Sequence, residues 1–144
     1  MKRKILFIDD EFAPDFEDAL GSYMSFYSLE LQEHGFDVTR CSSVDEAITA
    51  LVSDVFEMAI IDIMMPPGDE FTDQDTNYGM ATGTLLARKI KQQYPKLKII
   101  VLSNLTREEG AFADLLKEKV VDSILLKMDT TPSALCAELT SKVE

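Results

Sequence analysis

Short runs of apolar residues alternate with longer amphipathic stretches along the whole chain. The runs occupy residues 5–8, 36–39, 58–61, 99–102 and 124–126, and the second is the weakest because Asp37 interrupts it. Short, continuously apolar runs are typical of strands that are covered on both faces, as in a parallel sheet. Five repeats of a strand followed by a helix predict an α/β fold with right-handed crossovers.

The stretches between the runs carry helix signals. A long apolar stripe at three- and four-residue spacing predicts one helix over about 13–34. Ser43 and Glu46 form a capping box, in which each side chain satisfies a free backbone amide at a helix start. Thr131 followed by Pro132 predicts a capped start for the last helix. The stripe of the first helix consists of Phe12, Phe16, Leu20, Met24, Tyr27 and Leu31.

Composition and charge narrow the class of protein. A length of 144 residues fits one domain over 1–144, and the 46% apolar content is enough for a sizeable core. The net charge of −12 argues against direct binding to nucleic acid or to an anionic membrane. No segment approaches the roughly 18 apolar residues of a membrane span, and the apolar start is too short for a signal peptide. We therefore expect a cytoplasmic protein.

Polar side chains follow most of the predicted strands, at the point where each strand ends. Asp9, Asp10 and Glu11 follow the first run, Asp62 the third, Ser103 and Asn104 the fourth, and Lys127 the fifth. The carboxyl ends of parallel strands meet at one edge of a sheet, which is where ligands bind in such folds. Taken singly, an aspartate at a strand end is usually a turn former. The ordered set instead predicts one cleft lined by carboxylates, a hydroxyl and an ammonium.

These residue types suit phosphoryl transfer. Asp10 and Asp62 could give Mg²⁺ the hard oxygen ligands that it prefers, with Asp9 orienting a bound water. A carboxylate can itself act as the nucleophile and form an aspartyl phosphate. Lys127 and Ser103 could bind the phosphoryl oxygens, so the protein would mainly position groups and neutralise charge.

The ordered motifs resemble the receiver domains of two-component response regulators. Residues 4–11 look like the opening strand and acidic pair of that family, and 58–66 look like its phosphoacceptor motif, including Met65 and Pro66. Residues 99–104 match the strand of the switch Ser/Thr, and 125–127 match the strand of the lysine. The resemblance covers essentially the whole chain. It implies a flavodoxin-like (βα)5 three-layer sandwich with a five-stranded parallel sheet in the order 2-1-3-4-5.

The resemblance also implies a function. Asp62 would be phosphorylated from the phosphohistidine of a histidine kinase or a histidine phosphotransfer protein. Asp9, Asp10 and Asp62 would hold Mg²⁺ together with the backbone carbonyl of Met64. Ser103 and Lys127 would bind the phosphoryl group and report it to the face built from the last two helices and the last strand. The chain would be no enzyme beyond its own phosphotransfer and autodephosphorylation. As we expect no attached effector domain, its output would come from binding a downstream protein partner or from passing the phosphoryl group to a second histidine.

Two segments are longer than the receiver pattern. The first lies between Asp10 and Gly35, and its aromatic residues either pack on the sheet or form a surface for an apolar partner or a homodimer. The second is an inserted loop over about 67–82, ahead of Gly83, which matches the glycine that opens a helix in the family. Loops of this length are usually functional or disordered. We expect this loop to limit partner access or to slow water attack at Asp62.

Two single positions also depart from the pattern. Ile124 stands where the family usually has a switch aromatic, so coupling to the output surface is expected to differ. Met128 replaces the usual proline after Lys127, and a cis bond there without proline would cost about 3–4 kcal/mol. These departures keep a second hypothesis open, a degenerate receiver that binds proteins independently of phosphorylation. A phosphatase with an aspartate nucleophile fits less well, because Met64 stands where its second carboxylate would be.

Overall fold

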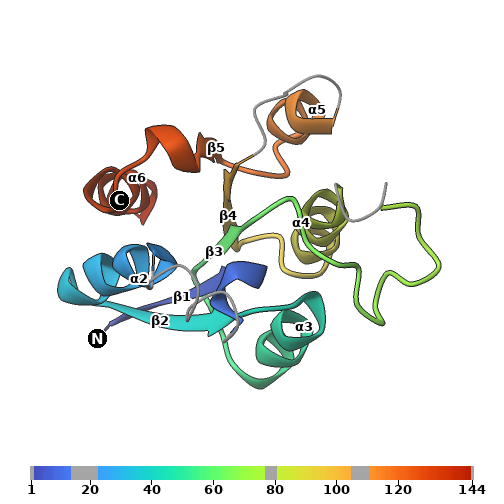
Figure 1. Cartoon of the computed structure of the whole chain (residues 1–144), viewed down its shortest axis with the longest axis horizontal. Helices are drawn as coiled ribbons and strands as arrows, with labels where there is room; N and C mark the ends of the chain where they lie inside the picture. The colour runs from blue at the N-terminus through green and yellow to red at the C-terminus, as the bar shows by residue number, and fades with distance from the viewer. Residues whose placement is uncertain (1, 14–22, 77–80, 105–110, 144) are drawn as a thin grey trace.

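The computed structural model describes residues 2–13, 23–76, 81–104 and 111–143. Five parallel strands form one sheet in the order β2-β1-β3-β4-β5 (Figure 1). The predicted α/β class, the parallel pairing and the strand order are therefore confirmed. The strands are β1 (Arg3–Ile8), β2 (Phe36–Cys41), β3 (Met58–Ile61), β4 (Lys98–Ser103) and β5 (Ser123–Leu126).

Helices cover both faces of the sheet and make a three-layer sandwich (Figure 1). One face carries α2 (Tyr23–Glu33) and α6 (Pro132–Val143), and the other carries α3 (Val44–Ser53), α4 (Thr82–Gln93) and α5 (Ala111–Lys117). Two short 3₁₀ turns, η1 (Asp10–Phe12) and η2 (Lys127–Asp129), come just after β1 and β5. Over the described residues, every helix is too short or too polar to cross a membrane.

The central strand β1 shows why the apolar runs are continuous. Leu6 and Ile8 belong to the core on the α3–α4–α5 side, whereas Ile5 and Phe7 belong to the core on the α2–α6 side. All four side chains are at most 1% exposed. Alternate residues of a strand point to opposite faces, so a strand that is covered on both sides needs an apolar residue at every position.

The predicted caps at Ser43 and Thr131 are present, but one hydrogen bond of the capping box involves a neighbouring residue. The Ser43 hydroxyl accepts the Glu46 N–H at 3.1 Å. The Glu46 carboxylate reaches back to the N–H of Ser42 at 2.6 Å, one residue before the position that a capping box predicts. At the last helix, the Thr131 hydroxyl accepts the Ala134 N–H at 3.1 Å, and α6 begins at the following proline, as predicted.

The first helix differs from the prediction at its start. Ala13 has an extended backbone, with φ −61° and ψ 143°, because it ends the 3₁₀ turn η1 rather than opening a helix. Residues 14–22, which include Phe16 and Leu20, lie outside the described residues. From Tyr23 the helix is as expected, and the apolar stripe is buried at Met24, Tyr27 and Leu31.

The inserted segment 67–82 is tied to the two helices beside it. The Asp45 carboxylate, in the first turn of α3, accepts the N–H groups of Asp69 at 2.9 Å and of Glu70 at 3.2 Å. Glu70 also pairs with Lys89 of α4 at 3.0 Å, and Phe71 is buried in the core. Residues 67–76 contain turns but no helix or strand, residues 77–80 lie outside the described residues, and α4 begins at Thr82. The described part of this loop is therefore anchored to the body of the domain.

Gly83 allows α4 to pack directly on the residues that follow β3. Its N–H donates to the Ile63 carbonyl at 2.8 Å. A Cβ atom at Gly83 would lie 2.1 Å from the Asp62 carbonyl oxygen and 2.5 Å from the Ile63 Cα. These distances are far inside van der Waals contact, and the atoms belong to the backbone. Only glycine therefore fits here without a shift of the segment that carries Asp62.

We predict that Gly83→Ala destabilises the protein by about 1–3 kcal/mol, because overpacking displaces backbone or forces strain. A glycine-to-alanine change inside a helix usually stabilises instead, by about 0.5–1 kcal/mol. The sign of the effect, measured by urea denaturation, is therefore diagnostic. Gln92→Ala, at an exposed position of the same helix, should change stability by less than about 0.5 kcal/mol. A Gly83→Ala variant as stable as the wild type would contradict the packing described here.

Candidate functional site

Three carboxylates meet at the carboxyl edge of the sheet. Asp9 directly follows β1, Asp62 directly follows β3, and Ile8 is the register partner of Ile61, so the two aspartates leave adjacent strands at the same level. Asp10 begins the turn η1. One oxygen from each of Asp9, Asp10 and Asp62 lies within 4.8 Å of the other two. The predicted convergence of these three carboxylates is present in the structure.

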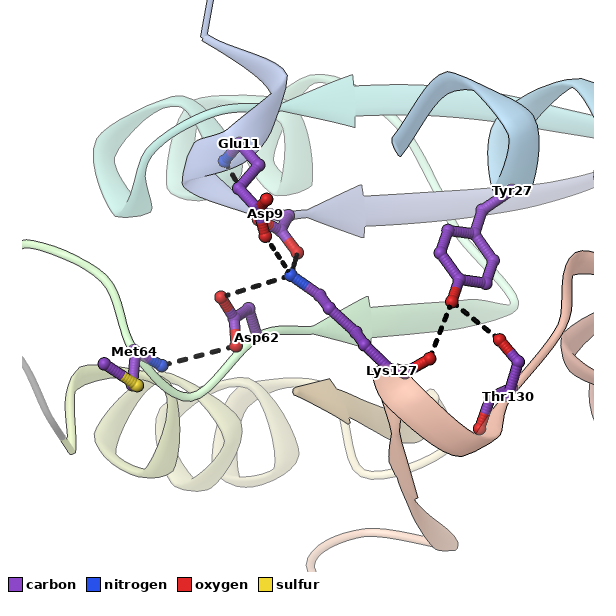
Figure 2. A network of polar contacts seen from close by, with 7 residues as sticks. All are labelled: Asp9, Glu11, Tyr27, Asp62, Met64, Lys127 and Thr130. Carbon is purple, nitrogen blue, oxygen red and sulfur yellow. Dashed lines mark hydrogen bonds and ion pairs between the residues drawn. The ribbon is translucent and has the colours of Figure 1, made fainter. Parts of the chain in front are cut away.

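Lys127 brings a buried positive charge into this cluster (Figure 2). Its side chain is fully buried, and it reaches across the sheet edge from the end of β5. The ammonium nitrogen lies 2.6 Å from Asp9 Oδ2 and 3.8 Å from Asp62 Oδ2. A third carboxylate, Glu11, is closest, with Oε2 at 2.5 Å. One cation is therefore shared by three acidic side chains.

Glu11 was not among the predicted site residues. Its backbone N–H donates to Asp9 Oδ1 at 2.9 Å, so Asp9 caps η1. This short turn directs the Glu11 side chain toward Lys127. Its position directly after Asp10 was the signal available in the sequence. That signal is weak, because the side-chain direction depends on the 3₁₀ geometry of η1. Glu11 competes with Asp62 for the lysine in this arrangement.

Ser103 and Met64 complete the surroundings of Asp62. Ser103 ends β4, the strand between β3 and β5, and is fully buried. Its side chain hydrogen bonds to the Asp62 carboxylate. The Met64 N–H reaches Asp62 Oδ1 at a long 3.4 Å (Figure 2). The role predicted for the Met64 carbonyl as a metal ligand stays a prediction.

Burial and crowding shift the acidity of the cluster. Burial, followed by the charge of Asp62, raises the pKa of Asp9 to about 7, although Lys127 opposes the shift. Burial also raises the pKa of Asp62, against the opposing effects of Lys127 and of the Ser103 hydrogen bond. Burial and the charges of Asp62 and Glu11 raise the pKa of Asp10. Burial lowers the pKa of Lys127, but the charges of Asp9 and Asp62 outweigh it and the net pKa is raised.

The cluster has the donor set of a site for a hard divalent cation. Mg²⁺ takes carboxylate and carbonyl oxygens, usually with several waters retained. Asp9, Asp10 and Asp62 offer three such oxygens at close range, and Lys127 neutralises only part of their charge. Burial and mutual repulsion raise the pKa values of these carboxyl groups, so their ionised forms need more positive charge nearby. The residues present therefore fit Mg²⁺.

The backbone from Lys127 to Asp129 forms a 3₁₀ turn, whereas the sequence did not determine its conformation. The turn η2 places Met128 at its middle, and this side chain is 71% exposed. All described peptide bonds are trans, including those of this turn. Ile124, in β5, is half-buried and packs against the core on the α3–α4–α5 side. Neither residue reproduces the group that the receiver pattern usually has at its position.

We predict that Asp10→Asn raises the melting temperature in EDTA, because it removes one of three mutually repelling carboxylates. Mg²⁺ should raise the melting temperature of the wild type by more than that of the variant, since the variant loses a metal ligand. Differential scanning fluorimetry with and without Mg²⁺ measures both effects. Asp73→Asn, an exposed loop position, changes the net charge equally and should show neither effect. If Asp10→Asn were less stable in EDTA than the wild type, repulsion within the cluster would be refuted.

Comparison with known proteins finds similar solved structures but no match by sequence. No family model and no curated protein matches the chain by sequence. Among solved structures, a CheY-like response regulator receiver domain protein from Methanospirillum hungatei is 20% identical, with a TM-score of 0.74 over 99% of this chain and 94% of that one.

Two further structures were solved with beryllofluoride. The isolated REC domain of RcsB from Salmonella enterica, in the presence of phosphomimetic BeF3⁻, is 21% identical, with a TM-score of 0.71 over 99% of this chain and 88% of that one. TrrA from Thermotoga maritima, in complex with Mg²⁺-BeF, is 24% identical, with a TM-score of 0.60 over 98% and 96% of the two chains. This chain therefore has the fold of response regulator receiver domains.

Proposed function

We propose that this protein is a phosphoacceptor receiver domain in which Asp62 takes a phosphoryl group. The donor is the phosphohistidine of a histidine kinase or of a histidine phosphotransfer protein. The observation that carries the proposal is the set of five groups at one sheet edge: Asp9, Asp10, Asp62, Ser103 and Lys127. The fold shared with receiver domains agrees with it, and so does the presence of phosphate mimics in two of those structures.

The chemistry follows from the positions of these groups. An oxygen of the Asp62 carboxylate attacks phosphorus, and the bond from phosphorus to the donor imidazole nitrogen breaks, leaving its electron pair on that nitrogen. The product is an aspartyl phosphate. Lys127 lies 3.8 Å from Asp62 Oδ2, close enough to balance charge on the transferred group. The Ser103 side chain, which already forms a hydrogen bond with the Asp62 carboxylate, is placed to donate one to a phosphoryl oxygen.

Asp9, Asp10, Asp62 and the carbonyl of Met64 would hold Mg²⁺. When bound, the ion neutralises negative charge between the carboxylates and the incoming phosphoryl group. The acidic residues of this chain would keep the ion next to the nucleophile. Phosphoryl transfer should accordingly require Mg²⁺, and Asp9 and Asp10 should be needed for it.

The output would be a protein–protein interaction rather than catalysis on a separate substrate. Phosphorylation would change contacts of Lys127 and Ser103 and so bias the surface near β5, where a downstream partner or a second copy of the chain would bind. We place the protein in the cytoplasm, where a soluble kinase domain could reach it. Ile124 in β5 and Met128 in η2 depart from the usual receiver pattern, so the signal would pass differently from that pattern.

One observation keeps the alternative of a degenerate receiver in view. The Lys127 ammonium is nearer to Glu11 and Asp9 than to Asp62. If Glu11 held the lysine permanently, the domain would serve as a binding module that does not use phosphate. The phosphorylation experiment distinguishes the two.

We predict that acetyl phosphate with Mg²⁺ adds the mass of one phosphoryl group to the wild type and none to Asp62→Asn. Intact mass spectrometry detects the adduct, and EDTA should prevent it in the wild type. Asp73→Asn, in the exposed loop, should be modified like the wild type. A wild type that stays unmodified at high acetyl phosphate concentration would contradict the proposal and favour the binding module. An adduct on both the wild type and Asp62→Asn would place the acceptor elsewhere.

The inserted loop is proposed to shield Asp62 from water or partners. Asp45→Ala removes the carboxylate that accepts the N–H groups of Asp69 and Glu70, so it should loosen this part of the loop. We predict severalfold faster loss of the phosphoryl group, followed by intact mass over time after removal of acetyl phosphate. Asp54→Ala, at the other end of the same helix, removes an exposed ion pair with Lys4 and should leave the rate unchanged. Equal half-lives for Asp45→Ala and the wild type would refute shielding by this loop.

A further inference from the structure

Tyr27 carries a buried hydroxyl that reaches the turn holding Lys127. The ring lies on α2 in the core of the α2–α6 face and is 2% exposed. Its hydroxyl donates to the Thr130 carbonyl at 2.7 Å and lies 3.3 Å from the Lys127 carbonyl (Figure 2). A buried tyrosine usually has such a partner. Here the partners are backbone groups about a hundred residues further along the chain.

The turn η2 is a single 3₁₀ turn that joins β5 to α6. It is closed by one backbone hydrogen bond, from the Thr130 N–H to the Lys127 carbonyl, at 3.3 Å. The residue before it, Leu126, gives no side-chain cap, and Met128 at its middle is largely exposed and packs little. Tyr27 therefore contacts the first residue of the turn and the residue that follows it. Its hydroxyl therefore restrains the backbone of Lys127, from which the side chain extends.

The position of the Lys127 backbone determines which carboxylate its ammonium group can reach. A lysine ammonium sits on a flexible four-carbon stem, so its position depends on the backbone and on the charges around it. Glu11 and Asp9 already hold the nitrogen at 2.5 Å and 2.6 Å, whereas Asp62 is at 3.8 Å. The contact to Asp62 is the longest and the first to be lost if the turn moves away. The Lys127 ammonium therefore stays near Asp62 only if η2 keeps its position.

We propose that Tyr27 is a positioning residue that holds η2 so that the Lys127 ammonium stays within reach of the phosphoryl group on Asp62. This inference rests on the proposed phosphoacceptor function. It also gives α2 a direct connection to the site, because the helix position sets the position of the turn. The hydroxyl acts through the backbone carbonyls of Lys127 and Thr130 and takes no part in the transfer itself.

The test is a double-mutant cycle between Tyr27→Phe and Lys127→Met. Phenylalanine keeps the ring in the core and removes only the hydroxyl. The initial rate of phosphorylation by acetyl phosphate at saturating Mg²⁺ is followed by intact mass, and Mg²⁺ affinity is measured separately by calorimetry. Tyr94→Phe is the matched control, because the Tyr94 hydroxyl also reaches a backbone carbonyl, that of Leu51 at 3.4 Å, in another part of the domain.

Tyr27→Phe should lower the rate about fivefold, the factor that loss of one hydrogen bond of about 1 kcal/mol gives. Its Mg²⁺ affinity should match the wild type, and it should have no effect when Lys127→Met is already present. Tyr94→Phe should react at the wild-type rate.

Three results would overturn the inference. These are an unchanged rate in Tyr27→Phe, an equal loss in both backgrounds, and a weakened Mg²⁺ affinity that accounts for the slower rate. If Lys127→Met yields no measurable product, the rate and affinity of the single variant decide. A wild type that acquires no phosphoryl group refutes the proposed function and this inference with it, whereas a modified wild type with an equally fast Tyr27→Phe refutes the inference alone.

Discussion

The buried ammonium of Lys127 is the charge that allows the carboxylates of this site to lie side by side. Asp9, Glu11 and Asp62 all lie within 4 Å of it, and its side chain is fully buried. Without that cation, burial and repulsion would favour protonated acids, and a protonated Asp62 is a poor nucleophile and a poor metal ligand. Because one positive charge cannot balance the whole cluster, negative charge remains that a divalent cation can satisfy. The same unbalanced charge makes the site sensitive to where the lysine sits.

The fold supplies the geometry that this charge requires. Parallel strands end at one edge, so the residues directly after β1, β3 and β5 and the last residue of β4 meet there although they are distant in sequence. Gly83 lets α4 lie against the backbone of Asp62 and Ile63, which fixes the nucleophile from the other side. Tyr27 ties α2 to the turn after β5. The site is thus held by all three layers of the sandwich.

Much of this arrangement was predictable because it depends on local pattern. Continuous apolar runs mark strands buried on both faces, and the polar residue after each run then falls at the sheet edge, which is how Asp9, Asp62, Ser103 and Lys127 were identified. The contacts of Glu11 and Tyr27 were not predictable in this way. Tyr27 fits the apolar stripe of its helix, and only the tertiary packing shows that its hydroxyl meets a carbonyl near Lys127. Ala13 is extended rather than helical, because it ends the capped turn η1, and residues 14–22 of the predicted first helix lie outside the described residues.

The central claim is that the groups at this edge form one site for Mg²⁺ and a phosphoryl group. A crystal structure of the protein with Mg²⁺ and beryllofluoride tests it most directly. We expect beryllofluoride on the Asp62 carboxylate, in contact with Ser103 and Lys127, and Mg²⁺ held by Asp9, Asp10 and Asp62. This result requires the Lys127 ammonium to move from Glu11 toward the bound group. A structure in which Lys127 stays with Glu11 and no beryllofluoride binds Asp62 at saturating concentration would contradict the account.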